Sequence, residues 1–200
     1  AYGVSNSTGQ VPRQEARKIV SLARLAGVDT IDTAISYGNS EVCLGEIGVG
    51  DFRVVTKLPP MPDDIADAAD WVRGQITGSL NRLGVARVHG LLLHRADQLL
   101  GKQGQTLASA LLRARQDGLV GKVGVSIYDP EQLAAIMPVC TPDIVQAPLN
   151  LLDRRLETSG WLQRLHDVGV EVHTRSAFLQ GLLVMNQATM PPRFGRWRVL

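Results

Sequence analysis

The chain has 200 residues, of which 44% are hydrophobic, so it is long enough to bury one core and too short for two independent domains. Its 21 basic and 19 acidic residues are scattered, and the formal net charge of +2 comes without the basic block that a nucleic-acid-binding protein needs. No apolar run approaches the roughly 20 residues of a membrane span, and the N-terminus has no signal-peptide character. Cys43 and Cys140 stand apart from any Cys/His cluster, so no metal site is expected. We therefore expect a single domain over residues 1–200, located in the cytoplasm, that binds neither nucleic acid nor membrane.

Short β-branched runs alternate with longer stretches of helical spacing from Val28 onwards, which is typical of βαβ units around a parallel sheet. In chain order, helices are predicted over 13–26, 41–47, 65–83, 106–116, 130–137 and 159–168, and strands over 30–33, 53–57, 88–94, 122–126, 144–147 and 170–176. Asp63 and Asp64 are predicted to open the helix over 65–83, because carboxylates suit the positive end of a helix. This alternation indicates the α/β class.

Right-handed connections between parallel strands lead either to an open sheet or to a closed (β/α)8 barrel of the TIM type. Six strands are visible in the sequence, whereas such a barrel has eight. We predict an incomplete (β/α)8 barrel that lacks a strand before Tyr2 and at least one βα unit after Leu200. An incomplete barrel exposes two strand edges, so the residues are either part of a longer chain or a fragment stabilised by a second copy.

Four residues with reactive side chains come at or just after the ends of the first three predicted strands. Asp32 lies near the end of the first strand and Tyr37 follows that strand, Lys57 ends the second and His94 ends the third. Because the C-terminal ends of barrel strands converge on one face, we expect these side chains to surround one pocket. A lysine ammonium lowers the pKa of a neighbouring phenol, a carboxylate keeps the ammonium charged, and a neutral imidazole polarises a carbonyl group. This set can protonate an oxyanion but cannot supply a hydride, which indicates a nicotinamide cofactor.

Each of these residues also has a simpler interpretation when it is taken alone. Asp32 suits a helix cap or a loop, Lys57 a surface position, Tyr37 a half-buried loop site and His94 a satisfied core position. Taken together, the four residues favour a different interpretation. A buried lysine is unfavourable unless it is paired with an opposite charge, and Asp32 at the end of the neighbouring strand provides that charge. The four residues together therefore favour a site over four unrelated positions.

The segments that carry these residues are similar to motifs of one enzyme family. In chain order they read DTAISYGNSE, VVTKLP, LLLHRAD, GKVGVSIYD, VQAPLN and RSAFLQGLL. In residues, order and spacing the chain resembles the aldo-keto reductase family over nearly its whole length. The resemblance implies a (β/α) barrel that reduces a small aldehyde or ketone with NADPH. It also implies that Asp32, Tyr37, Lys57 and His94 form the catalytic tetrad, with Tyr37 as the general acid.

The resemblance further assigns residues to the cofactor: Ser126 and Gln146 match positions that hold the nicotinamide carboxamide, and residues 176–181 match the segment along the pyrophosphate. The residues expected at the cofactor are Ser126, Gln146, Arg175, Ser176, Phe178, Gln180 and Gly181. Arg175 stands where many members stack an aromatic ring on the nicotinamide, and its charge is expected to disfavour the oxidised, cationic ring. Ile127 stands where many members have a polar residue. Gln146 is therefore expected to make more of the hydrogen bonds to the nicotinamide carboxamide.

Two other functions remain open at this stage. One is a cofactor-binding regulatory or redox-sensing subunit, because the resembled family includes channel-associated members with little turnover. The other is an inactive barrel fragment, because closing the barrel and binding the adenosine end require segments outside the sequence. The family's basic motif for the adenosine 2′-phosphate also lies beyond Leu200, so NADPH in place of NADH is an expectation from the resemblance.

Overall fold

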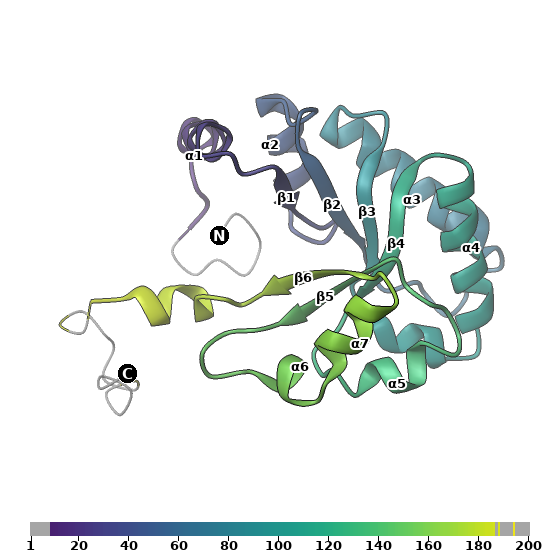
Figure 1. Ribbon diagram of the computed structural model, residues 1–200. Helices are drawn as coiled ribbons and strands as arrows, with labels where there is room; N and C mark the ends of the chain where they lie inside the picture. Colours follow the sequence, from purple (N-terminus) through teal and green to yellow (C-terminus); the bar gives the residue numbers. More distant parts are fainter. Residues whose placement is uncertain (1–8, 187, 189–193, 195–200) are drawn as a thin grey trace.

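The computed structural model describes residues 9–186, 188 and 194. These residues form a six-stranded, fully parallel sheet in which each strand pairs with its neighbours in the sequence. The strands are β1 (Thr30–Asp32), β2 (Arg53–Leu58), β3 (Val88–Leu93), β4 (Val120–Ser126), β5 (Ile144–Pro148) and β6 (Glu171–Arg175). The sheet is curled into a half-barrel with helices on its outer side, and β1 and β6 are its two edges (Figure 1).

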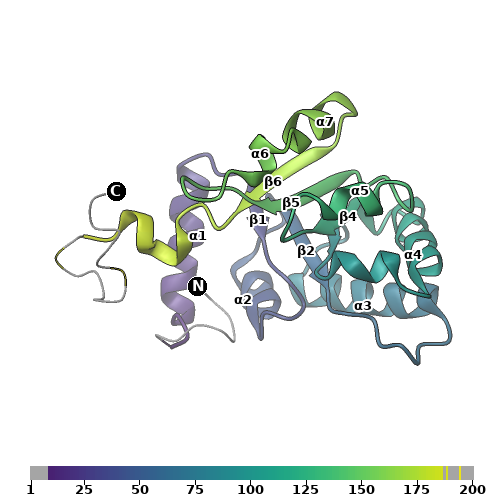
Figure 2. The same cartoon turned by 90° about the horizontal axis from the view of Figure 1, so that it is seen from below.

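Helix α1 precedes the first strand, and the other helices connect successive strands and cover the convex face of the sheet. They are α1 (Arg13–Leu25), α2 (Ser40–Ile47), α3 (Ala68–Leu83), α4 (Gly104–Gln116), α5 (Gln132–Ile136), α6 (Arg155–Thr158) and α7 (Trp161–Asp167), with 3-10 turns η1 (Ala96–Leu100) and η2 (Leu179–Val184). Helix α3 packs between α2 and α4, and Figure 2 shows α3 and α4 on the outer side of the central strands. Among the described residues, no helix is long and apolar enough to cross a bilayer.

The α/β class and the six strands in chain order agree with the prediction, and two helices differ from it. Helix α3 begins at Ala68 instead of residue 65, because Asp67 is its N-cap and accepts hydrogen bonds from the amides of Ala69 (2.8 Å) and Asp70 (3.0 Å). The helix predicted over 159–168 is α7 (Trp161–Asp167), and the sequence did not predict the short helix α6 (Arg155–Thr158) before it; Gly160, with a left-handed backbone and φ of 77°, separates the two.

Apolar side chains separate into an outer and an inner group. One large cluster of buried residues lies between the sheet and its helices, and it includes Val54 of β2 and Val72 of α3. A second, small cluster joins Val55, Leu92 and Ile144, which come from β2, β3 and β5. Since neighbouring side chains on a strand point to opposite faces, Val55 lies on the concave face when Val54 faces the helices. The concave face is therefore partly filled below the C-terminal strand ends.

A polar cluster also crosses the concave face, centred on Glu171 at the start of β6. The Glu171 carboxylate is hydrogen-bonded by His89 of β3 (2.9 Å), by His173 of β6 (2.6 Å) and by the ammonium of Lys122 of β4. Burial alone would raise the pKa of Glu171, but the hydrogen bonds from Lys122, His89 and His173 outweigh it and hold this pKa at about 2. The charged carboxylate thus ties β3 to β6 across the curl of the sheet.

Replacing Glu171 with Gln should lower the free energy of unfolding by about 2 kcal/mol near pH 7, because the cationic and imidazole donors lose their charged acceptor. The carboxyl has a pKa of about 2 in the folded chain against an ordinary value of 4.5. Its contribution is therefore fully present above the ordinary value and is lost as the pH falls towards the folded one.

Urea unfolding of the parent and the variant between pH 7 and pH 3 tests this expectation. The stability difference between the two proteins should shrink as the pH falls, whereas Glu15→Gln, at an exposed carboxylate, should change little at any pH. A difference that stays constant over this range would assign the loss to packing and not to charge.

Candidate active site

Polar and ionisable side chains gather at the C-terminal edge of the sheet. Along this edge lie Asp32 of β1, Lys57 of β2, His94 directly after β3, Ser126 of β4, Gln146 of β5 and Arg175 of β6. Tyr37 lies in the loop between β1 and α2. The parallel register aligns these strand ends, so the structure brings together residues that are more than a hundred positions apart.

The ammonium of Lys57 is buried at the centre of this edge. Its side chain is 1% exposed, and Nζ donates to both carboxylate oxygens of Asp32 at 2.7 Å and to the carbonyl oxygen of Thr33 at 2.8 Å. Burial lowers the pKa of Lys57 below its ordinary value, and the charge and hydrogen bonds of Asp32 oppose that effect. The three acceptors satisfy the three donors of the ammonium.

Tyr37 lies against both Lys57 and His94. Nζ of Lys57 is 5.2 Å from the centroid of the phenol ring, and the His94 ring meets that ring edge to face, with centroids 5.7 Å apart. Among the described residues, none hydrogen-bonds to the phenol hydroxyl, which leaves it available to a bound molecule.

The pKa of Tyr37 differs from the sequence-based expectation. We expected Lys57 to lower it, but burial and then the charge of Asp32 raise it above its ordinary value, while Arg175 lowers it. The reason is geometric: the ammonium of Lys57 is neutralised by a carboxylate that it binds with both oxygens. In the free chain the phenol therefore stays protonated at neutral pH.

The imidazole of His94 is neutral near pH 7. Burial lowers its pKa below the ordinary value of 6.5, the charges of Lys57 and Arg175 lower it further, and Asp32 opposes them. A neutral imidazole can donate one hydrogen bond to a carbonyl oxygen.

Ser126 and Gln146 extend the network from Asp32 into the sheet. Both are buried, Nε2 of Gln146 donates to Oδ1 of Asp32 at 2.8 Å, and the hydroxyl of Ser126 donates to Oε1 of Gln146 at 3.3 Å. The contact between Gln146 and Asp32 was not predicted from the sequence. Their shared position at strand ends was the available signal, but it did not identify them as partners.

Arg175 lies beside the cluster, and one of its guanidinium nitrogens makes no hydrogen bond to the described residues. Its Nη2 donates to the carbonyl oxygen of Ile127 at 3.0 Å, and its guanidinium carbon lies 4.4 Å from the ring centroid of Tyr128. Its Nε is buried and has no hydrogen-bond partner in the described part of the chain. A buried, unpaired N–H is unfavourable, so it marks a place where a ligand oxygen fits. The sequence analysis did not assign Tyr128, whose stacking partner lies on another strand.

The expected pyrophosphate segment follows Arg175 directly. Ser176, Gln180 and Gly181 have positive φ values of 60°, 57° and 95°, so the backbone turns repeatedly after β6. Nη1 of Arg175 is 3.4 Å from the Ser176 hydroxyl, whereas in the described residues no contact joins Phe178, Gln180 or Gly181 to the cluster at the strand ends. The structure thus brings Ser176 to the site and leaves the rest of the segment beside it.

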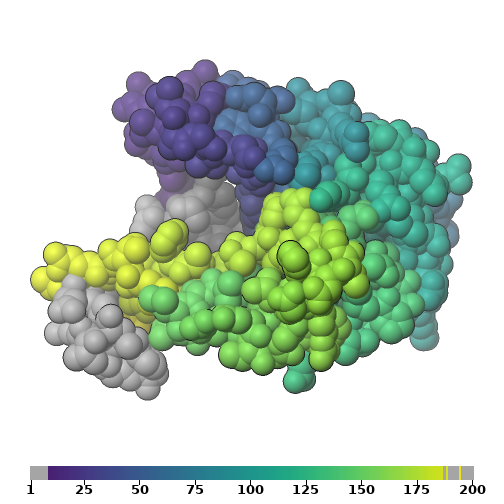
Figure 3. Space-filling view, in the orientation of Figure 1, coloured from purple at the N-terminus to yellow at the C-terminus, as the bar shows by residue number. Residues whose placement is uncertain are grey.

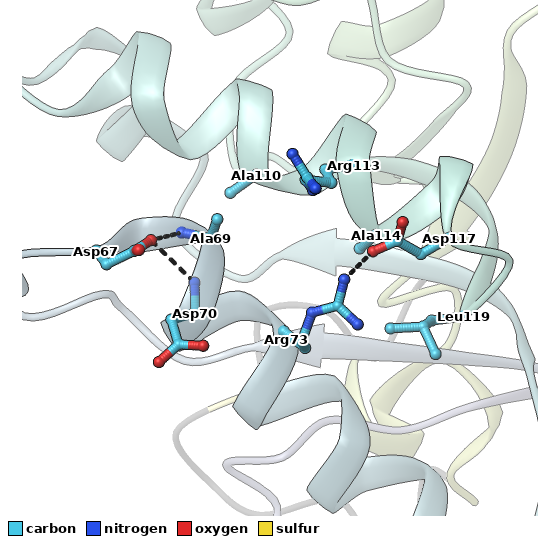
Figure 4. Close-up of a pocket in the computed structure, with 9 residues that line it drawn as sticks. All are labelled: Asp67, Ala69, Asp70, Arg73, Ala110, Arg113, Ala114, Asp117 and Leu119. Carbon is cyan, nitrogen blue, oxygen red and sulfur yellow. Dashed lines mark hydrogen bonds and ion pairs between the residues drawn. The ribbon is translucent and has the colours of Figure 1, made fainter.

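A separate cavity of about 280 Å³ lies between α3 and α4 on the outer side of the sheet (Figure 4). Asp67, Arg73, Arg113 and Asp117 are among its lining residues, and Arg73 is paired with Asp117. Since none of its lining residues comes from the C-terminal strand ends, this cavity is distinct from the candidate active site.

Nearly the whole chain matches a family model. The model of the "Aldo/keto reductase family" matches residues 1–198. An aldo-keto reductase from Mycobacterium sp. (strain MCS) is 32% identical over an alignment 159 residues long, gaps included, which covers 74% of this chain and 53% of that protein. An NADH-specific methylglyoxal reductase from Escherichia coli (strain K12) is 25% identical over an alignment 206 residues long, gaps included, which covers 88% of this chain and 60% of that protein.

The fold also has solved counterparts. The glycerol dehydrogenase AKR11B4 from Gluconobacter oxydans superposes with a TM-score of 0.73 and 27% identity, covering 92% of this chain and 61% of that one. The chain thus spans between about half and three fifths of the length of these proteins. The family match over nearly all residues confirms the resemblance: the chain belongs to the aldo/keto reductase family.

Proposed function

We propose that this chain reduces a small aldehyde or ketone to an alcohol with a reduced nicotinamide cofactor, and that Tyr37 is the general acid. The observation that carries the proposal is one cluster at the C-terminal strand edge. There a protonated phenol contacts a neutral imidazole and a carboxylate-bound ammonium, with ring and Nζ separations of 5.7 and 5.2 Å. Family membership and relatives whose names are those of reductases support the same reaction.

The side chains have distinct roles in this proposal. The neutral imidazole of His94 donates a hydrogen bond to the carbonyl oxygen and orients it. A bound nicotinamide ring supplies the hydride, which no side chain can. As negative charge develops on the carbonyl oxygen, the phenol of Tyr37 gives up its proton, because an alkoxide is a much stronger base than a phenolate. The ammonium of Lys57, held by Asp32, stabilises the phenolate that forms.

The cofactor fits the residues next to this cluster. Its nicotinamide end is assigned to Ser126, Gln146 and Arg175, where the buried Nε of Arg175 lacks a partner. Its phosphates are assigned to the turn formed by Ser176, Phe178, Gln180 and Gly181. We propose NADPH as the cofactor from the family resemblance. The binding and turnover measurements also include NADH, because one relative is NADH-specific.

The substitution Tyr37→Phe should lower kcat for carbonyl reduction by at least about 100-fold, because it removes the acidic proton and keeps the ring. Its dissociation constants for NADPH and NADH should stay within about twofold of the parent values, since the hydroxyl is assigned to the substrate side. Fluorescence quenching measures cofactor binding, and a panel of small aldehydes and ketones measures turnover.

Three results would contradict parts of the proposal. A variant as active as the parent would remove Tyr37 from the role of general acid. Cofactor binding by the parent without turnover would favour the regulatory or redox-sensing subunit. A chain of intact mass near 21.6 kDa that binds neither cofactor would not be a working reductase.

The substitution Arg175→Tyr should tighten binding of the oxidised cofactor by about three- to tenfold and change binding of the reduced cofactor little. The reason is that a guanidinium opposes the positive charge of the oxidised ring in a partly buried site. Titration of both cofactor forms measures the two affinities. An oxidised cofactor that binds the variant no more tightly than the parent would remove this explanation of Arg175.

A further inference from the structure

Glu41, the second residue of α2, is a buried carboxylate that the proposed reaction does not use. Its side chain is 3% exposed and accepts hydrogen bonds from the hydroxyls of Thr56 (2.6 Å) and Ser79 and from Nε of Arg82 (2.8 Å). These donors come from β2 and α3. A buried carboxylate is strongly unfavourable unless its partners stay in place, so the set holds α2, β2 and α3 in one arrangement.

Glu41 and Asp32 hold neighbouring residues of β2 from opposite sides. Thr56 directly precedes Lys57, and successive strand side chains point to opposite faces of a sheet. Thr56 meets Glu41 on the helix side, whereas Lys57 meets Asp32 on the concave side. The strand position that carries the ammonium therefore depends on both carboxylates.

The loop that carries Tyr37 runs directly into α2. The amide of Ser40, the first residue of α2, donates to the carbonyl oxygen of Tyr37 at 3.1 Å. The hydroxyls of Thr33 and Ser40 lie 3.0 Å apart and join the two ends of the loop. The position of α2 consequently sets where this loop ends and where the phenol lies.

Helices α2 and α3 are also in close backbone contact. A Cβ atom at Gly45 of α2 would lie 2.1 Å from the carbonyl oxygen of Arg82 in α3, so only glycine fits there. The two helices can approach no further, and the carboxylate of Glu41 holds them from separating. This combination fixes α2 relative to α3 more tightly than either feature alone.

We propose that Glu41 is a positioning residue for Tyr37. By holding α2 to β2 and α3, it sets the separations of the phenol from the ammonium of Lys57 and from the imidazole of His94, which are 5.2 and 5.7 Å. A misplacement of about 1 Å in a catalytic group can lower a rate by about 100-fold. The kinetic part of this inference rests on the proposed function, because the rate of carbonyl reduction reports on it.

The test compares Glu41→Gln with Glu46→Gln on the same helix. Glu46 is a matched control, because its carboxylate is 44% exposed and pairs with Arg13 at the surface. For Glu41→Gln, kcat should fall by about 10- to 100-fold while cofactor dissociation constants stay within about twofold. Glu46→Gln should retain the parent values. Equal kinetics in the two variants would overturn the proposal.

Both glutamate variants should also be made in a Tyr37→Phe background. If Glu41 acts through the phenol, Glu41→Gln should lower the residual rate by less than about twofold once the hydroxyl is absent. A role in general folding alone would lower the rate by the same factor in both backgrounds, and that outcome would overturn the proposal.

A readout independent of turnover separates this inference from the proposed function. The ring of His94 meets Tyr37 edge to face, so a shift of the phenol should move the NMR signals of the His94 ring in Glu41→Gln and not in Glu46→Gln. If Glu41→Gln does not fold, Thr56→Val, which removes one donor and keeps the side-chain shape, should give a smaller shift of the same signals. Unchanged His94 signals in a folded variant would contradict the positioning role even if the parent proves inactive.

Discussion

The buried ammonium of Lys57 is the group on which the arrangement of the candidate active site depends. Its three donors require three acceptors, and the structure supplies them from the end of β1 and the residue that follows it. An unpaired charge at this depth costs several kcal/mol, so the edge strand β1 and the start of the Tyr37 loop are held where Lys57 needs them. Gln146 binds the same carboxylate and extends the constraint to β5.

Positive charge exceeds negative charge around this ammonium. Asp32 neutralises Lys57. Burial lowers the pKa values of Lys57 and His94, and the guanidinium of Arg175 lowers them further; at Tyr37 the guanidinium only partly offsets the rise in pKa that burial and Asp32 cause. This surplus has two consequences in the proposed reaction. It adds to the burial that keeps the imidazole of His94 neutral, and it favours the negative charge that develops on the carbonyl oxygen.

That the residues at the strand ends lie close together could be predicted from the sequence. A parallel sheet brings the C-terminal ends of its strands to one edge, whatever the details of side-chain packing. Asp32, Lys57 and His94 could be placed together for that reason, and Tyr37 followed from the short loop after the first strand. The contact of Gln146 with Asp32 could not be predicted, because it depends on sheet curvature across residues 114 positions apart.

Other features of the site could not be predicted, because they depend on how deeply a side chain is buried or on its partners in elements far apart in the sequence. The raised pKa of Tyr37 follows from its burial, which no local pattern reveals. The stacking of Arg175 on Tyr128 requires the ends of β6 and β4 to be placed in space. Glu41 resembles any helix-opening acid in the sequence, and its partners appear only when α3 packs against α2. Local periodicity determines the elements, whereas the side-chain network depends on their packing.

The central claim is that a carbonyl compound bound at this strand edge receives a hydride from a nicotinamide ring and a proton from the protein. The most direct measurement supplies reduced cofactor with both C4 hydrogens of the nicotinamide replaced by deuterium, as NADPH and as NADH, together with a small aldehyde. Mass spectrometry of the products then locates the label. We expect one deuterium on the carbinol carbon of the alcohol. A cofactor that binds the chain and keeps all of its deuterium would contradict the claim and leave a cofactor-binding protein in place of a reductase.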